Sequence, residues 1–292
     1  MSFKLKSFKL PSKKVMTFFG TCIGISGLIY RDNVLSKEAK KNVQDRVSHL
    51  ALEPLGVHEL PRKVFIYLAP PVGDGLYKTR EYFREYVKPI LVAAALDYEV
   101  VEGARRGELK SKVCEEIIQK RRDLSSNTDN KDPSSLNRVG DGGIIVVGRV
   151  GWVEFLEGLN QGCFSSLEQP ADDSTKQENQ ENLQINKSTQ EIQFNEEEFS
   201  IPKVDQVGYI HFYNRIGWKN FPLRVYHFFN SYKNFEIAGE EAVGIVLGKT
   251  RDFKNEDLDF GKDEEMFFKD ELSEPKLDKR IANNLKIYTL GT

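Results

Sequence analysis

The pattern of apolar and polar positions predicts strands that alternate with helices from residue 61 onwards. Four short runs rich in β-branched and aliphatic residues are typical of buried strands: 63–69, 98–102, 142–149 and 242–247. Between them, the stretches 77–96 and 108–122 carry apolar residues at helical spacing, and Pro89 is expected to kink or split the first. Successive strand–helix–strand units predict crossover connections in a parallel sheet. The fold class is therefore α/β, with a Rossmann-like, mostly parallel sheet of about four strands.

The first of these strands ends in a stiff turn that we take as the candidate functional loop. Pro70 and Pro71 end the strand because proline cannot donate to a sheet ladder. Gly73 and Gly75 then flank Asp74, so the turn can adopt positive φ and hold a carboxylate near a helix start. Ligands usually bind at this edge of an α/β sheet.

The loop meets only part of a nucleotide-binding fingerprint. Gly73 and Gly75 follow a strand and Glu102 ends the next one, but position 78 is Lys rather than a third glycine. The sequence also lacks a P-loop, and its four histidines and three cysteines have no catalytic or metal-ligand spacing. We therefore predict no catalytic, cofactor-binding or metal-binding residues, and no enzyme. A membrane-anchored nucleotide- or phosphate-binding enzyme that uses the Gly73–Gly75 turn is the alternative.

The amino terminus has the features of a membrane anchor. Residues 1–14 form a basic leader with five lysines, and residues 15–30 are sixteen residues without a charge. As a helix these sixteen would span roughly 24 Å, somewhat less than a typical bilayer core of ~30 Å. Gly20, Gly24 and Gly27 share one face, which suits close packing between membrane helices. We predict a retained transmembrane helix over 15–30, with a cleaved signal peptide as the rival interpretation.

The rest of the chain divides by composition. Residues 31–60 read as a stalk helix and joint whose narrow apolar stripe leans on the α/β domain of residues 61–250. Residues 165–200 are acidic and amide-rich with few apolar side chains, so we predict a disordered insertion. Residues 251–292 read as a charged carboxyl-terminal tail. The formal net charge of −2 gives no indication of a nucleic-acid partner.

Several long motifs, taken together and in order, resemble the fungal Tim fifty-four subunit family of the mitochondrial inner-membrane carrier translocase. They are VSHLALEPL (47–55), LPRKVFIYLAPPVGDGL (60–76), EYVKPILVAAALDYEVVEG (85–103), GIIVVGR (143–149), GYIHFYNRIGWKNFPLRVYHFFN (208–230) and EEAVGIVLG (240–248). The resemblance covers most of the chain, but not the segments 125–137 and 165–200.

The resemblance implies a place and a role. It implies one span of the mitochondrial inner membrane, with the amino terminus in the matrix and the soluble domain in the intermembrane space. It further implies a non-catalytic accessory or scaffold subunit that supports insertion of multi-spanning carrier proteins. The implied partners are the channel-forming carrier translocase subunit and other membrane subunits, the small Tim chaperones, carrier precursors and inner-membrane lipid.

Overall fold

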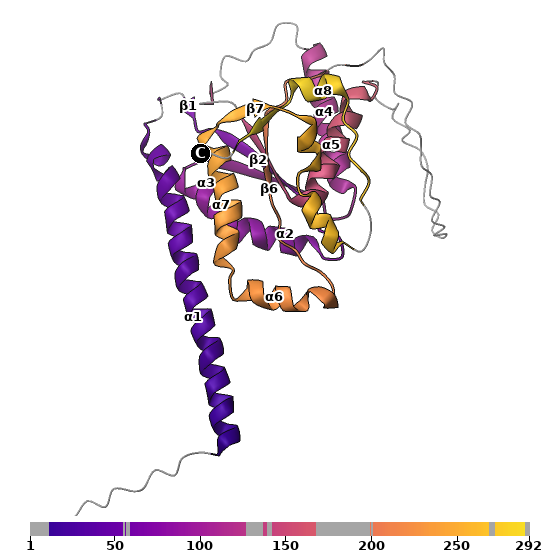
Figure 1. Ribbon diagram of the computed structural model, residues 1–292. Coiled ribbons are helices and arrows are strands. Elements are labelled where there is room, and N and C mark those ends of the chain that lie inside the picture. Colours follow the sequence, from indigo (N-terminus) through magenta and orange to yellow (C-terminus); the bar gives the residue numbers. More distant parts are fainter. Residues whose placement is uncertain are drawn as a thin grey trace, which may run out of the picture.

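The computed structural model describes residues 12–54, 56, 59–126, 137–138, 142–167, 199, 201–268 and 272–289. Most of the basic leader and of the expected disordered insertion, residues 1–11 and 168–198, lies outside the described residues. The described chain folds as one long helix beside a three-layer α/β domain (Figure 1).

The domain is organised around a six-stranded sheet in the order β3-β2-β5-β6-β8-β7. Its strands are β2 (Lys63–Leu68), β3 (Asp97–Glu102), β5 (Gly143–Val147), β6 (Gln206–Ile210), β7 (Thr250–Asp252) and β8 (Lys286–Tyr288). All neighbours pair in parallel except β7 and β8. A separate parallel pair joins β1 (Glu59–Leu60) to β4 (Asn137–Arg138). The expectation of an α/β fold with a mostly parallel sheet is confirmed.

Helices cover both faces of the sheet, because alternate residues of each buried strand point to opposite sides. On one side pack α4 (Glu108–Ser126), α5 (Gly148–Phe164) and α8 (Lys279–Asn284). On the other pack α2 (Leu76–Tyr82), a π-helical turn (Phe83–Val87), α3 (Lys88–Ala93) and α7 (Tyr232–Leu247). The shorter α6 (Phe221–Phe228) runs across the end of the domain between β6 and α7 (Figure 1).

The amino-terminal helix α1 (Lys13–Val47) is unbroken, so the predicted membrane helix and the predicted stalk helix form one element. Residues 12–31 are exposed, whereas Val43 and Val47 are buried against the domain. Gly239 of α7 lets this contact form, since a Cβ there would lie 3.1 Å from the Val43 side chain. Short 3₁₀ turns follow at Ser48–Leu52, and later in the chain at Trp218–Asn220, Asn255–Asp259 and Lys262–Phe267.

Among the residues that the structure describes, no helix is both long enough and apolar enough to cross a membrane.

Pro89 divides the helical stretch 77–96 as expected. It stands in the first turn of α3, where its missing N–H costs no helical bond. The preceding turn widens into the π-helical segment that joins α2 to α3. This break keeps Phe83, Tyr86 and Val87 on the core side while the chain changes helix.

Two expectations about the sheet are wrong. The run AVGIVL, 242–247, is the last part of α7 and not a strand; the periodicity that begins at Phe235 continues through it. Gly208 of β6 admits this helix, because a Cβ there would lie 2.4 Å from Ile245. The sheet has six strands rather than about four, and two of the additional strands, β7 and β8, come from the residues expected to be a tail.

Candidate functional site

The strand order marks one place on the sheet where an α/β fold offers a ligand site. From β2 the chain crosses to β3 on one side, and it then returns to β5 on the other side. The carboxyl ends of β2 and β5 therefore form the switch point at which connections diverge. The turn after β2 is the candidate loop with Pro70, Pro71, Gly73, Asp74 and Gly75, and the turn after β5 begins α5.

The β5–α5 junction is abrupt and depends on one glycine. Gly148 has φ +77°, and a Cβ at this position would lie 2.8 Å from Cβ of Phe212. Only glycine fits a left-handed backbone at such a close approach. The helix thus starts directly at the strand end, and its free amides lie at the switch-point edge.

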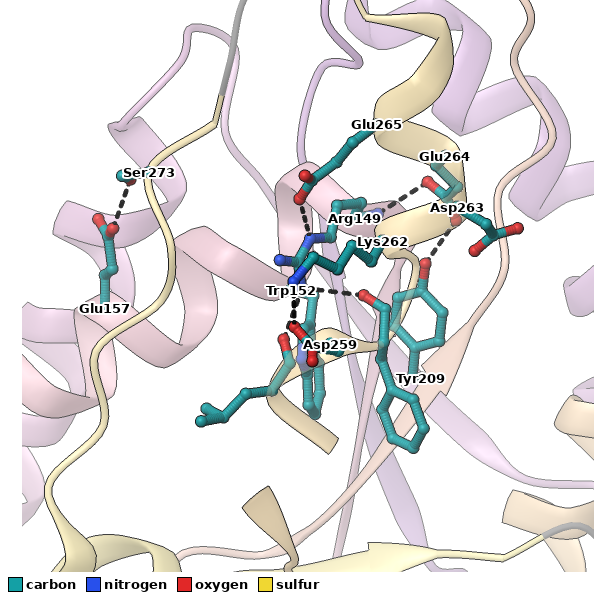
Figure 2. A network of polar contacts seen from close by, with 12 residues as sticks. Arg149, Trp152, Glu157, Tyr209, Asp259, Lys262, Asp263, Glu264, Glu265 and Ser273 are labelled. Atoms are coloured by element: carbon teal, nitrogen blue, oxygen red, sulfur yellow. Dashed lines mark hydrogen bonds and ion pairs between the residues drawn. The ribbon is translucent and has the colours of Figure 1, made fainter. Parts of the chain in front are cut away.

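A carboxylate from the same chain fills this helix start (Figure 2). The amide of Arg149 donates to Oε2 of Glu264 at 2.9 Å, and the amide of Phe212 donates to Oε1 at 2.9 Å. The Tyr209 hydroxyl donates to the same Oε1 at 2.5 Å. Burial raises the pKa of the Glu264 carboxyl to about 7, although these three hydrogen bonds and nearby His211 oppose the rise.

The side chain of Arg149 ties the same helix start to the carboxyl-terminal segment. It is buried, its Nε donates to Oε1 of Glu265 at 2.5 Å, and its Nη1 donates to the carbonyl oxygens of Leu258 and Phe260 at 2.6 and 3.0 Å. Trp152, one turn further along α5, donates from its indole Nε1 to the carbonyl oxygen of Asp257 at 3.0 Å. Figure 2 shows Glu264 and Glu265 on either side of Arg149.

These contacts decide what the β5 half of the edge can do chemically. In nucleotide-binding α/β folds, helix-start amides bind a phosphate. Here the helix-start amide of Arg149 is bonded to Glu264, which also accepts from the amide of Phe212 in the loop after β6, so this half of the edge is a structural joint. We call it the closed half.

The β2 half of the edge contains the candidate loop. Gly73 has φ +80°, as the turn requires, and Thr79 of α2 fixes the loop by donating to the carbonyl oxygen of Ala69 at 2.9 Å. Asp74 does not cap α2, contrary to expectation, because the cap is Gly75 without a side-chain bond. Its carboxylate instead accepts from Asn214 at 3.4 Å and from Tyr77 at 3.5 Å.

The candidate loop forms one wall of a groove with a cavity volume of about 440 Å³. The other walls are α2, the stretch 212–216 after β6, and the α6–α7 region. Three side-chain atoms there are shielded from solvent and have no hydrogen-bond partner among the described residues: Tyr213 Oη, Arg215 Nε and His227 Nδ1. We call this groove the open half of the edge.

The three unpartnered groups lie together. The rings of Tyr213 and His227 have centroids 3.9 Å apart, and the Arg215 guanidinium lies 4.5 Å from the Tyr213 ring. Burial, with the charges of Arg215 and Lys233, lowers the pKa of His227. The groove therefore combines aromatic and cationic groups with the carboxylates of Asp74, Glu81 and Glu85.

The second histidine of this region has a structural partner. The amide of His211 donates to Oε2 of Glu241 at 2.8 Å, and its Nδ1 contacts the other carboxylate oxygen. Burial lowers the pKa of His211, but the bond to Glu241 and the charges of Glu241, Glu264 and Asp263 outweigh it and raise the pKa. In the part of the chain that is described, no three His, Cys, Asp or Glu residues are placed to hold a metal ion.

The glycines expected to pack in a membrane stand on an open surface. Gly20, Gly24 and Gly27 lie in the exposed half of α1, and a Cβ at any of them would meet no atom within 4 Å. The structure thus leaves room for another helix along this face. The role of these glycines stays a prediction.

Sequence reasoning missed the closed half entirely. Arg149 follows the apolar run GIIVV after a single glycine, a position that signals a charge carried into the interior, but its acceptors lie more than 100 residues later. Glu264 stands in the acidic run KDEE, where nothing distinguishes it from its solvated neighbours. The candidate loop lies at the sheet edge and forms one wall of the groove, whose other walls from residues 212–234 no motif indicated.

Comparison with known proteins identifies relatives. Residues 1–200 match the family model described as "Inner membrane protein import complex subunit Tim54". Three curated relatives carry the name mitochondrial import inner membrane translocase subunit Tim54. They come from Aspergillus oryzae (29% identical over 299 residues, 83% of this chain), Neurospora crassa (35% over 187 residues, 56%) and Candida albicans (25% over 372 residues, 96%). The matches span 66%, 39% and 93% of these relatives' own lengths.

Proposed function

The chain belongs to the Tim54 family of inner membrane protein import complex subunits, and from this membership we propose that it is a non-catalytic accessory subunit of the carrier translocase. The observation that carries the proposal is the match of the family model over residues 1–200, which includes α1, the candidate loop and α5. In this role the chain supports insertion of multi-spanning carrier proteins into the mitochondrial inner membrane.

The proposed topology follows from α1. Residues 15–30 cross the inner membrane, with the basic leader in the matrix and the α/β domain in the intermembrane space. Two observations support it: residues 12–31 are exposed as a block, and the block carries no acidic residue. Lys13, Lys14 and Arg31 flank the uncharged stretch, so their side chains can reach the headgroups if the sixteen-residue stretch is short for the bilayer.

The proposed partners divide between membrane and intermembrane space. Gly20, Gly24 and Gly27 pack against the channel-forming subunit or another membrane subunit, and the domain docks the small Tim chaperones near carrier precursors. We do not propose the nucleotide-binding alternative, because the buried carboxylate of Glu264 occupies the start of α5 at the switch point and accepts from the amide of Arg149.

The first test isolates the chain with its neighbours. Tagged protein is purified from mild-detergent mitochondrial extract and every co-purifying chain is identified. Recovery of the carrier channel subunit and the small Tim chaperones is expected. Recovery of the tagged chain alone would refute the scaffold function.

The second test addresses the glycine face. Replacing Gly20, Gly24 and Gly27 by Leu should release the channel subunit, because bulky side chains prevent close approach of membrane helices. Cys22→Leu is the matched control, because two residues along a helix is the opposite face, and it should leave the assembly intact. Full assembly of the triple variant would show that this face is not an interface.

A further inference from the structure

The helix α6 and the 3₁₀ turn before it form an exposed apolar surface. No residue of α6 is buried. Trp218 is 88% exposed, Phe228 66%, Phe221 51% and Tyr226 50%. Leu223 and Val225 add to the same surface, which we call the α6 surface. Large apolar side chains gathered in this way mark an interaction site.

The polarity of α6 is reversed with respect to a water-facing helix. Its Arg224 and His227 side chains line the groove on the domain side, together with Phe228, whereas Leu223, Val225 and Tyr226 do not line it. A helix on a soluble domain turns its apolar side inward and its polar side outward. The side of α6 opposite the groove therefore suits an apolar medium.

The stretch of sequence that contains α6 carries only basic charges. From Gln206 to Phe235 the sequence contains no Asp or Glu, but it contains Arg215, Lys219, Arg224 and Lys233. Aromatic and aliphatic side chains flanked by basic ones are typical of helices that lie in the plane of an anionic membrane surface. A tryptophan at the headgroup level is also characteristic.

The end of α6 lies beside Arg31 and Asp32 of α1, the first charged residues after the uncharged stretch 15–30. Nη2 of Arg31 donates to the carbonyl oxygen of Phe229 at 3.0 Å and to Oδ1 of Asn230 at 2.8 Å. Asp32 accepts from the Ser231 hydroxyl at 2.6 Å and from the Tyr232 amide at 3.3 Å. The end of α6 is thus joined to the first two charged residues after the uncharged stretch 15–30. Figure 1 shows α6 beside α1 and directed away from it at this level, with the exposed part of α1 continuing beyond the domain.

We propose that the α6 surface is a second membrane contact, which lies in the headgroup layer of the same bilayer that residues 15–30 cross. The inference rests on the proposed function, because it uses the membrane position of α1. Trp218, Phe221 and Tyr226 enter the headgroup–acyl boundary, while exposed Lys219 meets anionic lipid together with Lys233, which donates to the Tyr226 hydroxyl. The bilayer is thereby the apolar medium that the reversed polarity of α6 requires.

The experiment uses the two tryptophans of the chain as probes. Trp218 is on the α6 surface, and Trp152 is fully buried in the domain. The full chain is reconstituted into vesicles that contain anionic lipid and a lipid with a quencher at headgroup depth. We expect quenching of the Trp218 emission and its loss in Trp218→Phe, which leaves only Trp152. Trp218→Phe combined with Leu124→Trp places a probe at another exposed position, near the end of α4, and should show no quenching.

A second variant tests the contact without probe replacement. Phe221→Glu puts a carboxylate in the first turn of α6, where it favours the helix and not its unfolding. It should reduce the quenching of Trp218 in anionic vesicles, whereas the fold, followed by circular dichroism, is retained.

The outcomes separate this inference from the proposed function. Co-flotation with vesicles and quenching of Trp218 support both. Co-flotation without quenching leaves the membrane anchor in place and overturns the α6 contact, which would assign the surface to a protein partner instead. Failure to float with the vesicles refutes the membrane position of α1 and the inference with it.

Discussion

The two halves of the sheet's carboxyl edge use the same kind of groups in opposite ways. In the closed half, Arg149 and Tyr209 donate hydrogen bonds to Glu264, and Arg149 also donates to Glu265. Both glutamates come from the carboxyl-terminal segment. In the open half, polar atoms of Tyr213, Arg215 and His227 have no partner among the described residues. Buried polar groups are stabilising only when paired. The closed half therefore holds the fold together, and the open half is the part left available for contacts.

The largest expected effect comes from removing the central cation of the closed half. Arg149→Met keeps the length of the side chain, but it leaves Glu265 and the carbonyl oxygens of Leu258 and Phe260 without their donor. Breaking such a buried charge network costs about 3–5 kcal/mol. Urea unfolding of the chain in detergent measures the loss. The control, Arg215→Met in the open half, should cost less than about 1 kcal/mol. Equal losses would remove the distinction between the halves.

The closed half should also make stability depend on pH. The pKa of Glu264 is raised from its ordinary 4.5 to about 7, so between these values the native chain holds a proton that the unfolded chain has released. Stability therefore falls as pH rises from about 4.5 to about 7, by at most about 3 kcal/mol. His211, whose pKa is also raised, adds a contribution of the same sign that is lost as pH rises through its native pKa.

The free energy of unfolding, measured at a series of pH values between about 5 and about 8, gives this slope. Glu264→Gln should flatten it, whatever its effect on the absolute stability. Glu265→Gln breaks an ion pair of the same network and should keep the slope. A slope unchanged in Glu264→Gln would show that this carboxyl is ionised throughout.

The smallest effects come from a matched pair of tyrosines. Tyr209→Phe removes the hydroxyl that donates to Glu264 and should cost about 1–3 kcal/mol, the range for leaving a buried acceptor without its donor. Tyr213→Phe removes a hydroxyl without a partner among the described residues and should change stability by less than about 0.5 kcal/mol. Thermal unfolding of both variants under one condition gives the comparison. A larger loss from Tyr213→Phe would mean that its hydroxyl has a partner in the native protein.

The parts of the fold that local sequence specifies were predicted well. Strands β2, β3 and β5 agree with expectation to within two residues, and Pro89 divides its helix as its missing N–H requires. The error at 242–247 arises because a run of six apolar residues has no period of its own, so only the residues before it show a helix. Strands β7 and β8 are only three residues each and contain charged side chains, so they are too short to show the alternating pattern of a strand.

The candidate site shows the same division. The positive φ of Gly73 follows from its place in a turn, and the position of the loop follows from the strand before it. The closed half depends on contacts between residues 149 and 257–265, and the groove depends on contacts between residues 73–86 and 212–234. Such pairings are set by tertiary packing, and no pattern within either segment contains them.

The continuity of α1 has a mechanical consequence. An unbroken helix that is packed on α7 at Val43 and joined to residues 229–232 at Arg31 transmits rotation from its exposed half to the domain. One residue added to a helix turns everything beyond it by about 100° and shifts it by about 1.5 Å. A single residue inserted in the stretch 15–30 would therefore turn the domain by about 100° relative to the part of α1 before the insertion, while leaving every contact inside the domain unchanged. The register of α1 thus sets the direction that the groove faces around the helix axis.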